Sequence, residues 1–337
     1  MFSKLIHHIR TRATNKLRIA IALSSLIVAA GIAFGITSSL AATAGTTQCT
    51  STVQSTTGVT ITGPTSNNCI AKFTSGTNQW TPPVGVVKAR LLVVGGGAGG
   101  DRGLCSYYWG HGGGGGGVYD SGSANRILLT SSAKNIVVGD GGARNGVDCQ
   151  AGNVGLPGSN SSFDGTYIAT GGKIASNSTV GNAGAYGGSS GTISTNGGTT
   201  YTASYSGGNG GGTGGAGCGS SQGYCGAGGG GGAGATGSGL NGGAGVTSDI
   251  TGTSLMYGMG GGGRNDQGSG SAYTTAGVLS SATAGVGTST YCDGAVNAGG
   301  GGGDCAPTGS GGAGGSGIVV LSWTVPALSI TTAADGF

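Results

Sequence analysis

Eight cysteines are the residues whose type and number most directly suggest chemistry. All eight follow residue 44 of the 337-residue chain. In an exported chain, an even number of cysteines is typical of a disulfide framework. Short separations favour four neighbouring pairs, and other connectivities stay open: Cys49–Cys69, Cys105–Cys149, Cys218–Cys225 and Cys292–Cys305. Zinc is the competing use, but the chain has no C-x-x-C motif and only His111 beyond residue 44.

The other polar residues do not form a catalytic set. General acid–base chemistry needs a histidine or paired carboxylates in a pocket, and His111 stands alone between glycines. Asp293 and Asp304 could in principle act as a glycosidase pair, but isolated aspartates in Gly/Ser loops are usually turn residues. Calcium-loop spacing is also absent. We therefore expect no enzyme activity and no metal.

The segment from Leu91 to Gly100 matches a dinucleotide-binding pattern. Gly95, Gly97 and Gly100 fill its three glycine positions after an apolar run. The pattern binds pyrophosphate because the third glycine opens a helix. Here six consecutive glycines follow at residues 112–117, so no helix can form, and we expect no cofactor.

Aromatic residues lie between the glycine tracts and suggest ligand binding. Aromatic anchors on loops of small residues are typical of binding surfaces. The binding-loop candidates are Tyr107, Tyr108, Trp109, Tyr201, Tyr205 and Tyr224. Tyr257 and the other tyrosines share this setting, and in the alternative interpretation several of these side chains cover the scaffold.

The elements that would position these residues are strands, because β-branched and aromatic runs alternate with turn residues. No segment after Gly45 has helical periodicity, and the chain contains no glutamate. The expected strands are residues 59–61, 70–73, 80–83, 86–94, 118–119, 127–130, 135–138, 162–163, 167–170 and 317–325.

The glycine tracts connect these strands. Glycine makes up 84 of the 337 residues, about a quarter, where ~7% is usual. It recurs at every third position in short registers, for example Gly208, Gly211 and Gly214. Polyproline-II geometry has three residues per turn, so this spacing favours packed polyglycine-II helices, and a disordered spacer is the alternative. Residues 171–315 contain few large apolar side chains and are not expected to form a conventional core.

Residues 1–44 have the features of an export signal. A basic start is followed by an apolar stretch at residues 19–36 and by Ala42-Thr43-Ala44, an A-x-A-like cleavage site. The apolar stretch is also long enough for an N-terminal membrane anchor. The leader holds five of the 14 basic residues, which leaves nine against ten aspartates. The rest of the chain therefore has no electrostatic surface for nucleic acid.

Several motifs together resemble the glycine-rich domain family of bacterial surface proteins, which is related in pattern to phage tail-tip adhesins. They are Phe73-Thr74-x-Gly76, Trp80-Thr81-Pro82-Pro83, Leu91 to Gly97, Ser161-Ser162-Phe163, and the closing Gly314 to Val320. The resemblance implies a β-sandwich-like frame with inserted polyglycine-II helices, and recognition through the loops that join them. The glycine registers of this chain are shorter, and its eight cysteines exceed the usual pattern.

The sequence therefore predicts an all-β protein with one N-terminal apolar helix, which is a signal or an anchor. Its expected parts are the leader 1–44, a Ser/Thr-rich arm 45–69, a glycine-rich β domain 70–325 and a tail 326–337. The expected function is extracellular or cell-surface adhesion or ligand recognition, with a surface glycan or protein as partner. Residues 19–36 are a possible membrane tether. The alternatives are a passive envelope component and an ice- or surface-binding protein.

Overall fold

The described part of the chain is entirely β. The computed structural model describes residues 49, 51–65, 67–100, 111–144, 155–174, 229–238, 241–265, 268–269, 292–303 and 311–325. All of them belong to the second of two compact units, residues 1–47 and 48–337. These ranges contain strands but no helix, and hence none that could cross a membrane. The expected N-terminal apolar helix lies outside the described residues.

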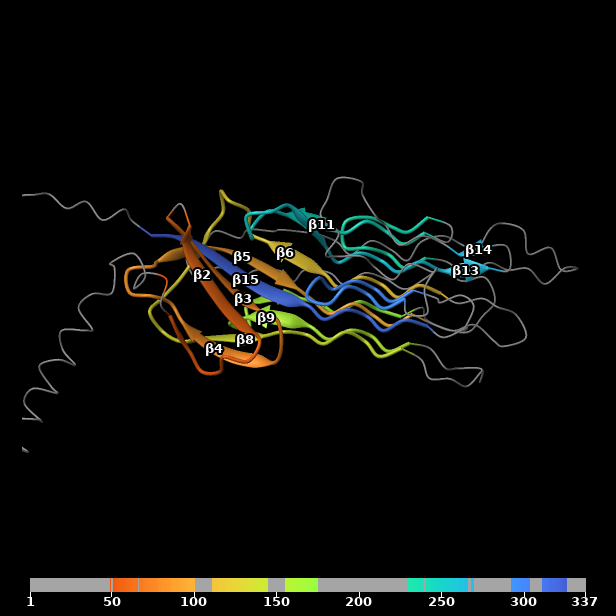
Figure 1. Cartoon of the computed structure of the whole chain (residues 1–337), viewed down its shortest axis with the longest axis horizontal. Helices are drawn as coiled ribbons and strands as arrows, with labels where there is room; N and C mark the ends of the chain where they lie inside the picture. Colours follow the sequence, from red (N-terminus) through yellow and green to blue (C-terminus); the bar gives the residue numbers. More distant parts are fainter. Residues whose placement is uncertain are drawn as a thin grey trace, which may run out of the picture. The chain divides into compact units, whose positions relative to one another are not determined.

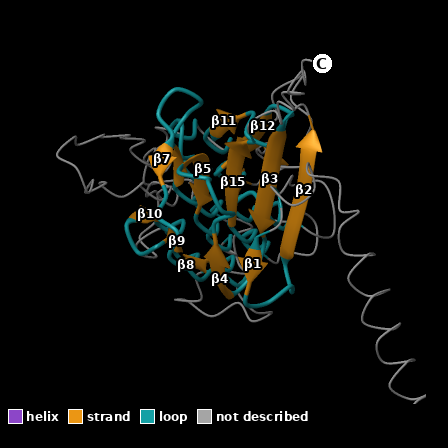
Figure 2. Cartoon of the chain, turned by 90° about the vertical axis from the view of Figure 1, so that its left-hand side faces the viewer, coloured by secondary structure: helices purple, strands orange, loops and turns teal. Residues whose placement is uncertain are grey.

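The larger sheet has six strands in the order β2-β3-β15-β5-β6, all antiparallel, and β7 pairs with the start of β5 (Figures 1 and 2). Its strands are β2 (Val59–Thr65), β3 (Asn68–Phe73), β15 (Ile318–Thr324), β5 (Lys88–Val94), β6 (Val118–Asp120) and β7 (Ile127–Leu128). The C-terminal strand β15 thus lies in the middle of the sheet.

The second sheet has five strands in the order β1-β4-β8-β9-β10, again antiparallel. Its strands are β1 (Thr52–Val53), β4 (Thr77–Thr81), β8 (Lys134–Val137), β9 (Ser161–Phe163) and β10 (Tyr167–Ala169). Strands β1 and β2 precede residue 70, so both sheets include residues of the segment expected to be an arm.

Turn residues set the ends of these strands. The hairpin between β9 and β10 turns through Asp164 and Gly165, whose φ angles are 53° and 63°. Glycine adopts this left-handed region without steric cost, and aspartate tolerates it better than most residues. The turn places Phe163 opposite Tyr167 and leaves both side chains in contact with the main core.

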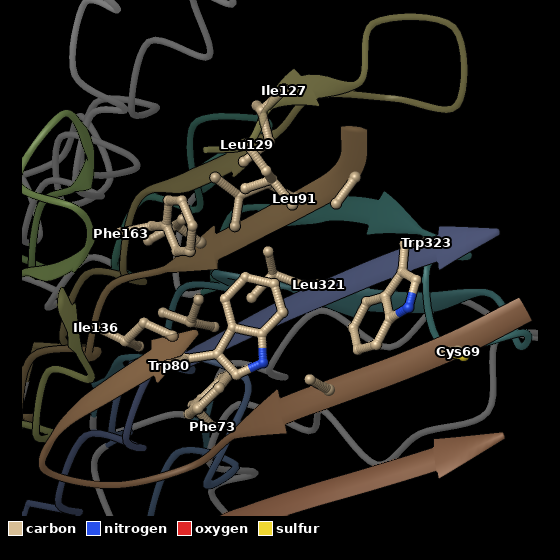
Figure 3. Packing of buried hydrophobic residues seen from close by; sticks show 14 of the residues in the cluster. Cys69, Phe73, Trp80, Leu91, Ile127, Leu129, Ile136, Phe163, Leu321 and Trp323 are labelled. Atoms are coloured by element: carbon tan, nitrogen blue, oxygen red, sulfur yellow. The ribbon is translucent and has the colours of Figure 1, made fainter. Parts of the chain in front are cut away.

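The main core lies between the two sheets and is built by side chains from both (Figure 3). Trp80 of β4 is central: its ring centroid lies 5.7 Å from that of Trp323 and 6.4 Å from that of Phe163. Phe73, Leu91, Ile136 and Leu321 pack around these rings. The two sheets therefore form a sandwich held by large apolar side chains.

The central strands β5 and β15 are buried on both faces. Alternate residues of a strand point to opposite faces, so Leu91 and Val93 enter the main core whereas Leu92 and Val94 enter a second cluster. The hairpin of β11 (Val246–Ser248) and β12 (Leu255–Tyr257) covers this second face. A further small pair is β13 (Arg264–Asn265) with β14 (Gly268–Ser269).

This second cluster corrects one expectation. Residues 171–315 were expected to lack a conventional core, yet they supply Ile250, Met256, Tyr257 and Met259 to a cluster with Val320 of β15. A few apolar residues suffice there because the other half of the cluster comes from the outer face of the six-stranded sheet. The strands expected from the sequence are otherwise confirmed, and their ends agree or differ by at most four residues.

Candidate functional site

Between the strands run glycine-rich segments that pair with one another through backbone hydrogen bonds. We call this set the glycine array. It comprises residues 95–100, 111–117, 139–144, 155–159, 170–174, 229–235, 241–245, 258–263, 299–303 and 311–317. Segment 95–100 continues directly from β5, segment 111–117 leads into β6, and segment 311–317 leads into β15 (Figure 1).

The hydrogen bonds of the array repeat every three residues. In segment 95–100, any two residues that are three positions apart donate their backbone N–H groups to the same neighbouring segment. The two accepting carbonyls are also three positions apart. Gly95 donates to Gly117 and Ala98 to Gly114, both in segment 111–117. Gly96 donates to Ser159 and Gly99 to Leu156, both in segment 155–159. Gly97 donates to Gly315 and Gly100 to Gly312, both in segment 311–317. Successive residues thus bond in three different directions, whereas a strand bonds in two.

Segment 95–100 has six bonded neighbours. Its N–H groups reach segments 111–117, 155–159 and 311–317, as above. Its carbonyls at residues 96, 97 and 98 accept from Gly172, Gly142 and Gly302, which belong to three further segments. This segment is therefore the centre of the array, with one neighbour on each of six sides.

Glycine is required here because the segments touch backbone to backbone. A Cβ atom on Gly97 would overlap the carbonyl of Gly300, and one on Gly141 would overlap the carbonyl of Gly314. Larger exposed side chains occur on an outer segment, where Leu156 and Ser159 face solvent. The glycine content is thus a packing requirement of the described array.

The array and the disulfide lie at opposite ends of the six-stranded sheet. The register pairs Trp323 with Cys69 and Ser322 with Arg90, so the start of β3, the start of β5 and the end of β15 share one end, which we call the base. At the other end, Ile318 pairs with Val94, and segments 95–100 and 311–317 begin there. We call the side on which the array extends away from the sheet the tip.

The proposed aromatic binding residues are not among the described ones. Tyr107, Tyr108, Trp109, Tyr201, Tyr205 and Tyr224 all lie outside the ranges given above. Tyr257, which has a similar sequence setting, is only 2% exposed and packs in the second cluster. Burial raises the pKa of its hydroxyl. At this position the covering interpretation is the correct one.

One of the four expected disulfides is confirmed, that between Cys49 and Cys69. Cys292 is also disulfide-bonded. Cys105, Cys149, Cys218, Cys225 and Cys305 lie outside the described residues. The Cys49–Cys69 bond fixes the start of the domain to β3 at the base.

The dinucleotide-like motif is part of the array. The N–H groups of all six residues from Gly95 to Gly100 donate to carbonyls of neighbouring segments. A phosphate bound by this motif would need those same donors. The described residues also contain no group of three or more His, Cys, Asp or Glu side chains placed to hold a metal ion.

A charged cluster that the sequence did not reveal joins the hairpin β11–β12 to the sandwich. Arg90 donates to both carboxylate oxygens of Asp120, at 3.0 and 2.7 Å, and also binds Asp249. Ser248 donates to Asp120 at 2.6 Å. The hydrogen bond from Arg90 lowers the pKa of Asp249, and the bond to Asp120 raises that of Arg90. The partners are up to 159 residues apart, so no local pattern could have identified them.

Comparison with known protein families identifies the chain. The sequence model of the glycine-rich domain matches residues 73–324, which covers most of the chain. The chain belongs to the glycine-rich domain family. No curated protein matches it. In this member of the glycine-rich domain family, the matched region runs from the end of β3 to the end of β15 and thus includes most of the main core and the whole array.

Proposed function

We propose that this glycine-rich domain protein is a non-enzymatic recognition protein of the cell surface or extracellular space. The observation that carries the proposal is the opposite placement of the base and the tip. The chain begins its fold at the base, where Cys49 is bonded to Cys69. The array extends on the other side of the sandwich, and chain segments with aromatic residues connect its members.

The array supports this proposal because it would hold those connections on a stiff support. We infer that its segments are polyglycine-II helices: a helix with three residues per turn directs successive N–H groups in three directions, as the bonds of residues 95–100 require. Six neighbours around one segment match the packing of such helices side by side. A flexible spacer would not form these regular backbone hydrogen bonds between segments.

The connecting residues are the proposed contact surface. Segment 95–100 ends at Gly100, and the adjacent segment 111–117 begins at His111. The ten residues between them include Tyr107, Tyr108 and Trp109. Two or more aromatic side chains among small residues suit a glycan or a protein surface. We propose a surface glycan or protein as the partner, with Tyr201, Tyr205 and Tyr224 as further contacts.

The proposed location is outside the cytoplasm. The Cys49–Cys69 disulfide and the oxidised state of Cys292 are compatible with an oxidising compartment. The leader 1–44 would export the chain, which is then either secreted or held by residues 19–36. We also expect the other five cysteines to be oxidised, so that thiol counting on the exported protein finds none free.

A binding experiment with the full exported chain tests the function. Labelled protein is applied to a glycan array and to intact cells, and the triple variant Tyr107→Ala, Tyr108→Ala, Trp109→Ala is compared with it. We expect the variant to lose binding at least tenfold while its circular dichroism is unchanged, because removal of hot-spot aromatics costs ~2 kcal/mol or more in total. The matched control is Leu156→Ala, an exposed apolar residue of the array.

Two results would contradict the proposal. If the wild type binds neither cells nor glycans, the chain is better explained as a passive envelope component. If the triple variant binds as well as the wild type, recognition does not use residues 107–109.

A further inference from the structure

Three exposed apolar side chains gather at the base. Val84 is fully exposed, Val87 is 61% exposed and Leu128 is 67% exposed. Val87 and Leu128 lie on neighbouring segments, because the N–H of Leu129 donates to the carbonyl of Val87 and Leu128 pairs with Lys88. Val84 precedes Val87 by three residues, in the loop that leads into β5. The five exposed large apolar residues in the described ranges are these three plus Leu156 and Val296, which belong to other parts of the chain.

Two cations stand beside this apolar group. Both are exposed: Lys88 begins strand β5, and Arg126 directly precedes strand β7. Arg126 donates to the hydroxyl of Thr324 at 3.0 Å. The ion pairs of the described ranges join Arg90 with Asp120 and Asp249, and Lys134 with Asp164, so neither Lys88 nor Arg126 has a carboxylate partner there. The base therefore carries apolar side chains together with uncompensated positive charge.

The same end of the domain is the one nearest in sequence to the leader. Residues 37–48 separate the apolar stretch 19–36 from Cys49, and an extended chain of this length reaches ~40 Å at most. Cys49 is bonded to Cys69. Cys69 pairs with Trp323, one residue from the Thr324 that binds Arg126.

We propose that the base rests on the phospholipid surface of the membrane that holds the leader. Val84, Val87 and Leu128 enter the interface, and Lys88 and Arg126 contact lipid phosphates. Exposed apolar residues with basic neighbours have the composition of membrane-contact surfaces. The proposal rests on the tethered form of the proposed function, and it directs the tip and its connections away from the bilayer.

The test uses the full chain, leader included, in vesicles of phosphatidylcholine and phosphatidylglycerol with brominated acyl chains. Tryptophan is introduced at the base in Val84→Trp, and at an exposed array position in the matched control Leu156→Trp. The emission of each variant is corrected for that of the parent chain. Flotation reports independently whether the protein is in the vesicles.

We expect severalfold stronger quenching by bromine in Val84→Trp than in Leu156→Trp. Adding Lys88→Glu and Arg126→Glu to Val84→Trp should reduce this quenching, and so should high salt, because salt screens contacts between exposed charges.

Other outcomes overturn the proposal. Equal or absent quenching at position 84 in protein that floats with the vesicles refutes the membrane contact but leaves recognition at the tip untouched. A blue-shifted emission without quenching means that a protein surface covers the base. Failure to float refutes both the tether and the contact.

Discussion

The sandwich is held together by side chains, whereas the glycine array is held together by the backbone. In the sandwich, side chains fill the space between sheets, and Trp80, Phe163 and Trp323 meet through their rings. In the array, the backbones themselves meet, and residue 97 donates to one segment while its carbonyl accepts from another. The first region needs large side chains, and the second needs none.

This difference decides how each region tolerates change. A core of side chains accepts swaps of similar volume at a cost below ~1.5 kcal/mol, because neighbours repack. A backbone contact cannot repack in this way, because an added Cβ atom would overlap a backbone carbonyl, which cannot move aside as a side chain can. We therefore expect the smallest possible addition, one methyl group, to be harmful in the array.

The largest effect is expected from Trp80→Ala, which empties the centre of the sandwich. The loss should be about 4 kcal/mol in the free energy of unfolding, since truncation of a buried aromatic leaves a cavity. The bond from its indole N–H to Ser51, 2.7 Å, is lost as well. Urea unfolding measures the change. Trp80→Phe keeps most of the volume and should cost clearly less; equal losses would mean that ring packing does not hold the sandwich.

Gly97→Ala addresses the array and should destabilise the protein by about 3 kcal/mol, the upper range for overpacking. The new methyl group overlaps the carbonyl of Gly300, a backbone atom. The control is Gly165→Ala, which has open space around it but a φ of 63°, so only about 1 kcal/mol is expected. Urea midpoints compare the two. A smaller loss at Gly97 than at Gly165 would contradict the close backbone packing.

Most of the sandwich could be predicted from the sequence, because β-branched runs such as residues 88–94 and 318–324 mark its strands. Two kinds of feature could not. The partners of segment 95–100 lie up to 218 residues away, from Gly97 to Gly315, and glycine carries no side chain that would indicate its neighbour. The strands Val246–Ser248 and Leu255–Tyr257 were also missed, because they are short and lie among Gly, Ser and Thr residues that show no apolar alternation.

The same reasoning applies to the candidate sites. Cysteine spacing was informative for Cys49 and Cys69 because a disulfide closes a short loop of the chain. The cluster of Arg90, Asp120 and Asp249 and the apolar group at the base form only when distant strands pair. Their residues look like ordinary surface residues until the register is known.

Asp120→Asn tests how firmly the β11–β12 hairpin is joined to the sandwich. The side chains of Arg90 and Asp120 are 14% and 7% exposed, so removing one charge leaves the other poorly compensated. Because Asp249 still binds Arg90, the expected loss is about 2 kcal/mol, less than for a fully buried pair that is broken. Urea unfolding measures it, with Asp140→Asn, an exposed residue of the array, as the control. If Asp120→Asn and Asp140→Asn cause equally small losses, the charged cluster contributes little to the free energy of unfolding.

The smallest effect concerns pH and distinguishes the two cores. Burial raises the pKa of Tyr257 in the second cluster and of Tyr119 in the main core above the ordinary value near 10. A group whose pKa is raised in the folded state contributes full stability below the unfolded pKa, and this is lost as the pH rises toward the folded pKa. Stability should therefore fall above about pH 10. In Tyr257→Phe and in Tyr119→Phe the fall should be shallower by up to ~1.4 kcal/mol per pH unit, while stability at pH 8 changes little. Urea midpoints at pH 8 and pH 11 measure this. If Tyr119→Phe flattens the decline and Tyr257→Phe does not, the second cluster is open to water in solution, and only the main core behaves as a closed interior.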